Sequence, residues 1–257
     1  MPVNIVARVG DFCIKLVEHL GGMALMLVQG LLLTFSPPLR VKNFFKQMEF
    51  IGVNSILVVV LTALFSGMVL ALQGYYGFRK FGGESLLGAT VALSLTRELG
   101  PVLTSLMVTA RAGSAIAAEI GTMRVTEQID ALESMAVNPL HYLVTPRLWA
   151  GFLMVPLLTV VANVVGIAGG YLIGVVLLNI DPGVFINKMV ELVELSDITN
   201  GLYKAVVFGG LLALVGCYKG YHARGGAEGV GKATTEAVVI SSVGILILDY
   251  ILTSLLF

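Results

Sequence analysis

The chain has 257 residues, of which 57% are hydrophobic and 12% are charged, about half the charged share of an average soluble protein. Sixteen basic residues balance sixteen acidic ones, so the formal net charge is zero and nothing in the composition favours a nucleic-acid partner. These values predict an all-α integral membrane protein. The two cysteines, Cys13 and Cys217, are far apart in apolar stretches, and we expect both to be packing residues, with no disulfide and no metal site.

The first 48 residues are predicted to form an interfacial helix followed by a re-entrant or elbow segment. Four charges share one face of a helix over residues 4–19: Arg8, Asp11, Lys15 and Glu18. A helix with one charged and one apolar face is typical of the membrane interface. The apolar run over 20–35 is shorter than the roughly 20 residues that a spanning helix needs, which favours an interfacial or re-entrant segment over a span.

Residues 49–257 are predicted to form a transmembrane domain of about five helices. Long apolar stretches place these spans at about 51–76, 84–110, 148–178, 198–218 and 236–257. The third span carries Gly166, Gly170 and Gly174 at four-residue spacing, which predicts a ridge for close helix packing. An acidic loop is expected over 179–197 and a glycine-rich basic loop over 219–232.

The distribution of positive charge predicts the orientation of the chain. If the N-terminal region and the segments 111–147 and 219–232 are cytoplasmic, that side carries eleven Lys and Arg residues. The opposite side then carries only Arg79, Lys80 and Lys188. Because cytoplasmic loops are enriched in positive charge, the N-terminus is expected in the cytoplasm and the C-terminus on the outer side, which requires an odd number of spans.

Two opposite charges, Arg97 and Glu98, lie inside the second predicted span and are followed by Gly100-Pro101. Charge near the centre of a bilayer costs roughly 2.5–3.5 kcal/mol per residue on insertion scales and usually marks a pathway or a site. Neighbouring residues do not share a helix face, so Arg97 and Glu98 are expected to have different partners. The charges either hold the helices together or serve the pathway directly.

The segment of about 111–147 between the second and third spans is too patterned to be a simple turn. Its first part is expected to extend the second span, and a short amphipathic helix follows, with Ile129, Leu132 and Met135 on one face. The helix is expected to end near Asn138-Pro139. Such a helix either docks into a groove of a soluble partner or rests on the membrane, and its acidic face favours docking because cytoplasmic leaflets are anionic.

At these residues the chain resembles the MlaE family, the permease subunits of Mla-type ABC transporters for phospholipids in Gram-negative envelopes. The resemblance is carried, in order, by Arg97–Pro101, Arg111–Ser114, Ala118–Met123, Thr126–Gln128, Asn138-Pro139, Pro146–Gly151, Pro156–Thr159 and Gly229–Thr235. It covers almost the whole chain, although the first 50 residues match only loosely.

The resemblance implies a homodimer in the bacterial inner membrane, bound to two ATPase subunits. It also implies a periplasmic ring of MCE-domain subunits and a small cytoplasmic STAS-type subunit. The coupling segment that seats in the ATPase would include Glu127, Gln128, Ile129 and Leu132. The chain has no phosphate-binding loop of the form G-x-x-x-x-G-K-[ST], so it is not expected to be an enzyme or to hold a cofactor, and ATP and magnesium would be used by the ATPase.

For the substrate, the resemblance implies a phospholipid pocket at the dimer axis. Arg97 would meet an anionic head group and Glu98 a head-group amine. Lys204 in the fourth span is expected to reach Glu98, a lipid phosphate or the interface, and Asp249 is a candidate partner. Three further pocket residues follow from the resemblance: Leu70, Gln73 and Leu99. Phe81 is also a candidate, but it stands where the family is expected to have tyrosine, so a hydroxyl contact is lost there.

A stand-alone ion-coupled carrier is the alternative function, with Arg97, Glu98 and Lys204 as its relay. It predicts an internal repeat, which the sequence does not show. A membrane-embedded enzyme is less favoured, because the three histidines are scattered and no nucleophile or metal motif accompanies them.

Overall fold

The computed structural model describes residues 5–35, 37 and 41–256, and every regular element in this part of the chain is helical. The α-helices are α1 (Ile5–Leu32), α2 (Val41–Ile51), α3 (Ile56–Arg79), α4 (Leu87–Ser94), α5 (Gly100–Val108), α6 (Ser114–Val125), α7 (Gln128–Ser134), α8 (Thr145–Tyr171), α9 (Pro182–Leu192), α10 (Leu195–Tyr221) and α11 (Gly226–Leu256). Short 3-10 turns occupy Leu33–Phe35, Val53–Ser55 and Glu84–Leu86, and π-helical turns occupy Leu95–Leu99, Thr109–Gly113, Leu140–Val144 and Leu172–Leu177.

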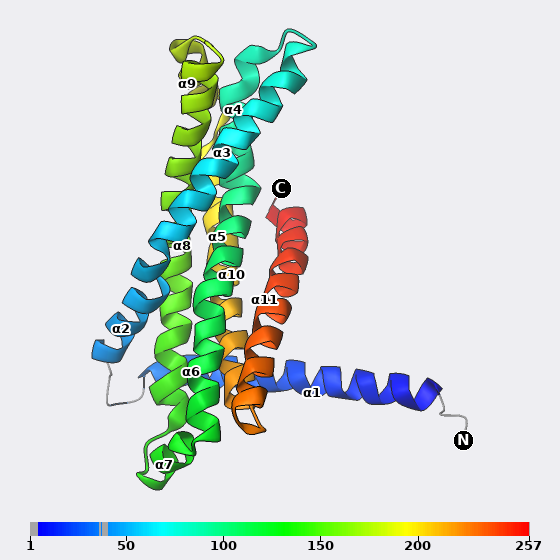
Figure 1. The fold of residues 1–257 in the computed structure, drawn as a ribbon, viewed down its shortest axis with the longest axis vertical. Helices are drawn as coiled ribbons and strands as arrows, with labels where there is room; N and C mark the ends of the chain where they lie inside the picture. Colours follow the sequence, from blue (N-terminus) through cyan, green and yellow to red (C-terminus); the bar gives the residue numbers. More distant parts are fainter. Residues whose placement is uncertain (1–4, 36, 38–40, 257) are drawn as a thin grey trace.

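Six helical stretches in the described part of the chain are long and apolar enough to cross a membrane. They are Cys13–Leu32, Val41–Arg79, Glu84–Val125, Leu140–Leu177, Leu195–Tyr221 and Gly226–Leu256. The last five form an elongated bundle, in which α3 packs on α8 while α10 packs on α6, α8 and α11 (Figure 1). The chain is therefore an all-helical, multi-pass membrane protein.

The N-terminal helix α1 crosses one end of the bundle instead of running along it (Figure 1). It corrects one expectation, because the charged segment and the apolar run after it form one helix up to Leu32 and not two segments. Gly21-Gly22 does not break it, since Gly22 is the point at which α1 packs against the ring of Tyr218. Its transverse direction and its exposed Val17 and Leu20 agree with a place in the interface. The expected start at residue 4 and the side chain of Arg8 lie outside the described residues.

The second predicted span is longer than expected, because one helical path runs from Glu84 to Val125. The expectation that it continues beyond residue 110 is confirmed. Pro101 does not end the path, because it stands in the first turn of α5, directly after the π-helical turn Leu95–Leu99. Proline is tolerated in a first turn, and the extra residue of the π turn absorbs the local change in hydrogen bonding.

The glycine ridge of α8 makes the close contacts that its spacing predicts. A Cβ atom on Gly67 of α3 would lie 1.9 Å from the carbonyl oxygen of Gly166, so the two backbones nearly touch. A Cβ atom on Gly170 would lie 2.7 Å from Val91, and one on Gly174 would lie 3.1 Å from Phe185 of α9. The ridge therefore packs α8, and the π-helical turn after it that holds Gly174, against three other helices, as small residues do in membranes.

Two expected loops are mostly helical. The acidic segment 179–197 contains α9, which begins where Asp181 accepts a hydrogen bond from the Val184 amide at 2.9 Å and Pro182 follows. The segment 219–232 is a loop only over 222–225, because the positive φ angles of Gly225 and Gly226 end the turn and α11 starts at once. Gly229 and Gly231 lie inside α11 despite the low helix propensity of glycine, so the glycine content of the segment was misleading. The predicted fifth span therefore begins ten residues too late, and its last residue, 257, lies outside the described part.

The two cysteines differ in their surroundings. Cys217 is buried between helices, which confirms its packing role, whereas Cys13 is exposed on α1. The packing role that the sequence suggested for Cys13 is therefore not seen within the chain.

Candidate functional site

Arg97 and Glu98 lie in the π-helical turn Leu95–Leu99, and they have different partners, as their adjacency predicts. The guanidinium of Arg97 donates from Nε and Nη2 to Oδ1 of Asp197, at 2.8 and 2.7 Å. The carboxylate of Glu98 accepts a hydrogen bond from Nζ of Lys204 through its Oε2 atom at 2.7 Å. The two charges therefore fasten the second span to two different points of α10.

Lys204 is the centre of a buried ion cluster that joins three spans. Its ammonium group also lies 3.1 Å from Oδ1 of Asp249, 2.7 Å from Oγ1 of Thr253 and 3.1 Å from the carbonyl oxygen of Arg97. The side chain of Lys204 is 0% exposed, and a buried ammonium needs such a full set of acceptors. The contacts that were expected between Lys204, Glu98 and Asp249 are confirmed. One ammonium and two carboxylates leave this cluster a formal charge of −1.

Asp197 is the partner that the sequence did not reveal. Its Oδ2 atom accepts the backbone N–H of Glu194 at 3.0 Å, in a reciprocal capping box that begins α10. Its Oδ1 atom holds Arg97, so one buried carboxylate both starts a helix and neutralises a membrane charge. Gly201 follows one turn later, where a Cβ atom would lie 2.0 Å from the carbonyl oxygen of Thr96. This close backbone approach brings Asp197 within reach of Arg97.

Although both charged side chains have ion-pair partners, neither is buried. The side chains of Arg97 and Glu98 are 41% and 38% exposed, whereas their partners Asp197 and Lys204 are almost completely buried. A molecule beside the bundle can therefore reach the outer edge of each pair. Arg97 and Glu98 are paired within the chain and are also accessible from outside. They can therefore both hold the helices together and serve the pathway, which the sequence analysis treated as alternatives.

The remaining candidate pocket residues are divided between a packed cluster and the surface. Leu70 and Leu99 are half-buried and pack against an apolar cluster around Leu87, Leu95 and Phe185. Gln73 is exposed near the end of α3, and Phe81 is 89% exposed in the turn after it. Within a single chain, Gln73 and Phe81 therefore present themselves to the outside and do not close a cavity.

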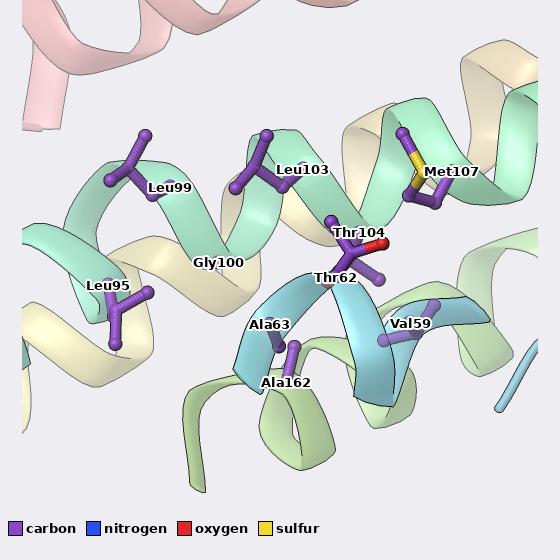
Figure 2. A pocket seen from close by; sticks show the side chains of 10 residues that line it. All are labelled: Val59, Thr62, Ala63, Leu95, Leu99, Gly100, Leu103, Thr104, Met107 and Ala162. Atoms are coloured by element: carbon purple, nitrogen blue, oxygen red, sulfur yellow. The ribbon is translucent and has the colours of Figure 1, made fainter. Parts of the chain in front are cut away.

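A narrow apolar pocket adjoins the π turn between α3, α5 and α8 (Figure 2). Its cavity volume is only about 10 Å³, far below the roughly 300–1,000 Å³ of ordinary ligand sites. Figure 2 shows Leu99, Leu103 and Met107 in one row along the helix, pointing away from Ala63 and Ala162. At this place the chain thus offers an apolar row beside the charge pairs, but the pocket itself is too small for a lipid.

The predicted coupling segment is an α-helix that follows a sharp turn. Glu127 has a φ of 58°, in the left-handed region, and α7 begins directly after it. The apolar face that was expected to dock on a partner packs inward instead. Ile129 is 0% exposed against the chain's own core, and Leu132 packs beside it. Amphipathicity alone does not distinguish a helix that docks outward from one that packs inward. The outward surface of the segment includes Glu127 and Gln128 and also Met135, which is exposed although it was expected on the same face as Ile129 and Leu132.

Comparison with known proteins gives a consistent result over the whole chain. A family model described as Permease MlaE matches residues 44–255. A Rickettsia typhi protein named a probable ABC transporter permease is 46% identical over 257 residues, covering 100% of this chain and 99% of that protein. A Haemophilus influenzae protein named intermembrane phospholipid transport system permease protein MlaE is 44% identical over 261 aligned residues, with the same coverage. The Arabidopsis thaliana chloroplast protein TRIGALACTOSYLDIACYLGLYCEROL 1 is 39% identical over 216 residues, covering 84% of this chain and 62% of that protein.

Proposed function

The chain belongs to the MlaE permease family, and we propose that it carries phospholipid between membranes as the membrane-spanning subunit of an ABC transporter. As an ABC permease it works with an ATPase subunit and does not itself hydrolyse ATP. The phospholipid substrate is supported by the name of the Haemophilus influenzae relative, which is similar to this chain from end to end. The open apolar row beside the charge pairs suits a lipid better than a small polar solute.

We extend this proposal to the assembly in which the chain works. Two copies would face each other in the bacterial inner membrane, with the N-terminus in the cytoplasm and the C-terminus in the periplasm. Each copy would bind an ATPase that uses ATP and magnesium, and a STAS-type subunit and a periplasmic MCE-domain ring would complete the complex. The small volume of the pocket beside the charge pairs supports a site completed by the second copy, with Leu70, Gln73, Phe81 and Leu99 at its wall.

The observation that carries the mechanism is the continuous helical path from Glu84 to Val125. It holds Arg97 and Glu98 near one end and leads into the turn at Glu127 at the other. Thirty residues separate Arg97 from Glu127, which is about 45 Å of helix at 1.5 Å per residue. The path includes two π-helical turns, Leu95–Leu99 and Thr109–Gly113. Such turns are common at functional sites. A movement of the coupling segment would thereby shift the charge pairs.

At the charge pairs, each side chain has a distinct task. The carboxylate of Glu98 belongs to a cluster with an excess negative charge, so it would accept the amine of a zwitterionic head group. The guanidinium of Arg97 would meet the head-group phosphate, since its side chain is 41% exposed although it is paired with Asp197. Closure of the two copies would then displace the lipid from the apolar row.

The test is ATP-driven transfer of labelled phospholipid by the purified complex in liposomes. The double variant Arg97→Gln and Glu98→Gln keeps hydrogen-bonding groups of similar size but leaves the buried Asp197 without its cation, so size-exclusion chromatography must first show that the complex assembles. In the assembled complex we expect loss of most transfer. The control removes another ion pair, Lys188 with Glu191 on α9, which is exposed and joined at 2.7 Å. Full transfer by the Arg97 and Glu98 variant, with the control also active, would overturn the assignment of this site.

A further inference from the structure

A separate pocket with a polar lining lies at the end of the bundle that α1 crosses. It forms where α1 meets the last turn of α10 and the first turns of α11. Its polar lining consists of His19, Lys219, His222, Arg224, Lys232 and Glu236, with the Tyr218 hydroxyl 3.1 Å from Nδ1 of His19. Fourteen residues of α10 separate Lys204 from Tyr218, about 21 Å of helix, so this pocket is remote from the charge pairs.

The pocket has an excess of positive charge. Lys219 donates to Oε2 of Glu236 at 2.8 Å, and this pair is neutral. Arg224 and Lys232 have no hydrogen-bond or ion-pair partner within the described part of the chain, so the lining carries a formal charge of +2. The positive end of the 31-residue helix α11 lies beside it and adds to the potential. A concave site with these charges attracts an anion.

The backbone is shaped to hold Arg224 at this place. Gly225 and Gly226 have φ angles of 92° and 67°, which turns the chain sharply after Arg224. A Cβ atom on Gly229 would lie 1.7 Å from the carbonyl oxygen of Arg224, so only glycine permits the turn to close against α11. The backbone of Arg224 is thereby held against the first turns of α11, and Arg224 lines the same pocket as Lys232.

The surroundings indicate what kind of anion fits. On α11, Lys232 and Glu236 continue at spacings of three and four into exposed Val239, Val243 and Leu246, on one helix face. A basic end thus passes directly into an apolar stripe, which matches the head and tails of a phospholipid. The transverse helix α1 carries exposed apolar side chains at the same end of the bundle, which places the pocket at head-group level (Figure 1).

We propose that this pocket binds the phosphate of an anionic phospholipid from the leaflet on which α1 lies. Arg224 and Lys232 contact the phosphate, and the acyl chains lie along Val239, Val243 and Leu246. The bound lipid joins α1 to α11 through its head group, and it is a resident partner and not the transported molecule. The assignment requires only that the chain is a membrane protein, so it stands apart from the proposed transport activity.

The test is a lipid titration of the purified full-length chain in non-ionic detergent, followed by native mass spectrometry. Phosphatidylglycerol is the anionic probe and phosphatidylcholine of the same acyl composition is the neutral one. The double variant Arg224→Gln and Lys232→Gln should bind phosphatidylglycerol roughly thirty-fold more weakly, since each basic residue near a membrane surface contributes about five-fold in affinity. The matched control, Arg79→Gln with Lys80→Gln, removes the same charge from the end of α3 and should bind phosphatidylglycerol like the parent chain.

Both altered side chains are exposed and unpaired within the described residues, so the variant should fold normally. Unchanged phosphatidylglycerol affinity in this variant would overturn the proposal, and so would equally tight binding of phosphatidylcholine by the parent chain. Displacement of the lipid by millimolar inorganic phosphate would also overturn it, because the site would then be one for free phosphate. The titration uses neither ATP nor an ATPase, so its failure would leave the transport proposal untouched.

Discussion

Replacing Lys204 with methionine should be one of the most destabilising single changes in the bundle. The substitution keeps the length of the side chain but removes the ammonium that Glu98, Asp249 and Thr253 share. Two carboxylates of the cluster then face each other without a cation. Removing one partner of a buried ion pair costs about 3–5 kcal/mol. For a chain of this size, that free energy corresponds to a fall in melting temperature of about 6–20 °C.

The assay is thermal unfolding of the purified protein in detergent, monitored by the loss of the monodisperse peak in size-exclusion chromatography. Lys188→Met is the control, because Lys188 forms an exposed pair with Glu191, and such pairs contribute at most about 1 kcal/mol. Adding Glu98→Gln and Asp249→Asn to Lys204→Met should restore most of the lost stability, since no buried charge is then left unpaired. If Lys204→Met melts like the control, or if the triple variant is less stable than the single one, the role given to this cluster is wrong.

Three further changes test the packing and the coupling segment. Gly67→Ala should cost about 1–3 kcal/mol of stability, because its Cβ atom would meet the backbone of α8. Gly77→Ala is the control, since its Cβ atom would meet nothing within 4 Å, and it should melt no lower than the parent chain. Ile129→Asp places a charge in the core and should cost about 3–5 kcal/mol of stability. Met135→Asp on the exposed side should change the stability by no more than about 0.5 kcal/mol. Equal melting temperatures of the two variants would contradict the inward packing of α7. Glu127→Lys should leave the melting temperature unchanged but abolish stimulation of the ATPase by the permease, and normal stimulation in an ATPase assay of the complex would argue against a coupling role for that turn.

The buried ion cluster shows how far the sequence leads. Charges inside apolar stretches are rare enough that Arg97, Glu98, Lys204 and Asp249 could all be identified as special from their position alone. Helix geometry was sufficient to separate the partners of Arg97 and Glu98. Asp197 was missed because it lies 100 residues from Arg97, in a segment that was expected to be a loop. Its only local signal was the capping relation with Glu194, which indicates a helix start and not a membrane ion pair.

Other features depend on tertiary contacts that leave no local pattern. The π-helical turns insert a residue without a sequence signature, so the sequence showed the Gly100-Pro101 step but not the change of helix pitch just before it. The inward packing of Ile129 could not be distinguished from an outward docking face, since both require the same amphipathic spacing. The direction of α1 was predictable, because its charged face favours the interface, but its continuity to Leu32 depends on packing against Tyr218.

The most direct test of the central claim is the energy source of lipid movement. The complex of this permease with its native ATPase should be reconstituted in liposomes whose ion gradients have been dissipated, and transfer of labelled phospholipid should be measured with and without ATP. We predict transfer that requires ATP hydrolysis, persists without any gradient and is lost in the Arg97→Gln and Glu98→Gln variant. Transfer that is driven by an ion gradient in liposomes containing this chain alone would contradict the account and would support the ion-coupled carrier instead.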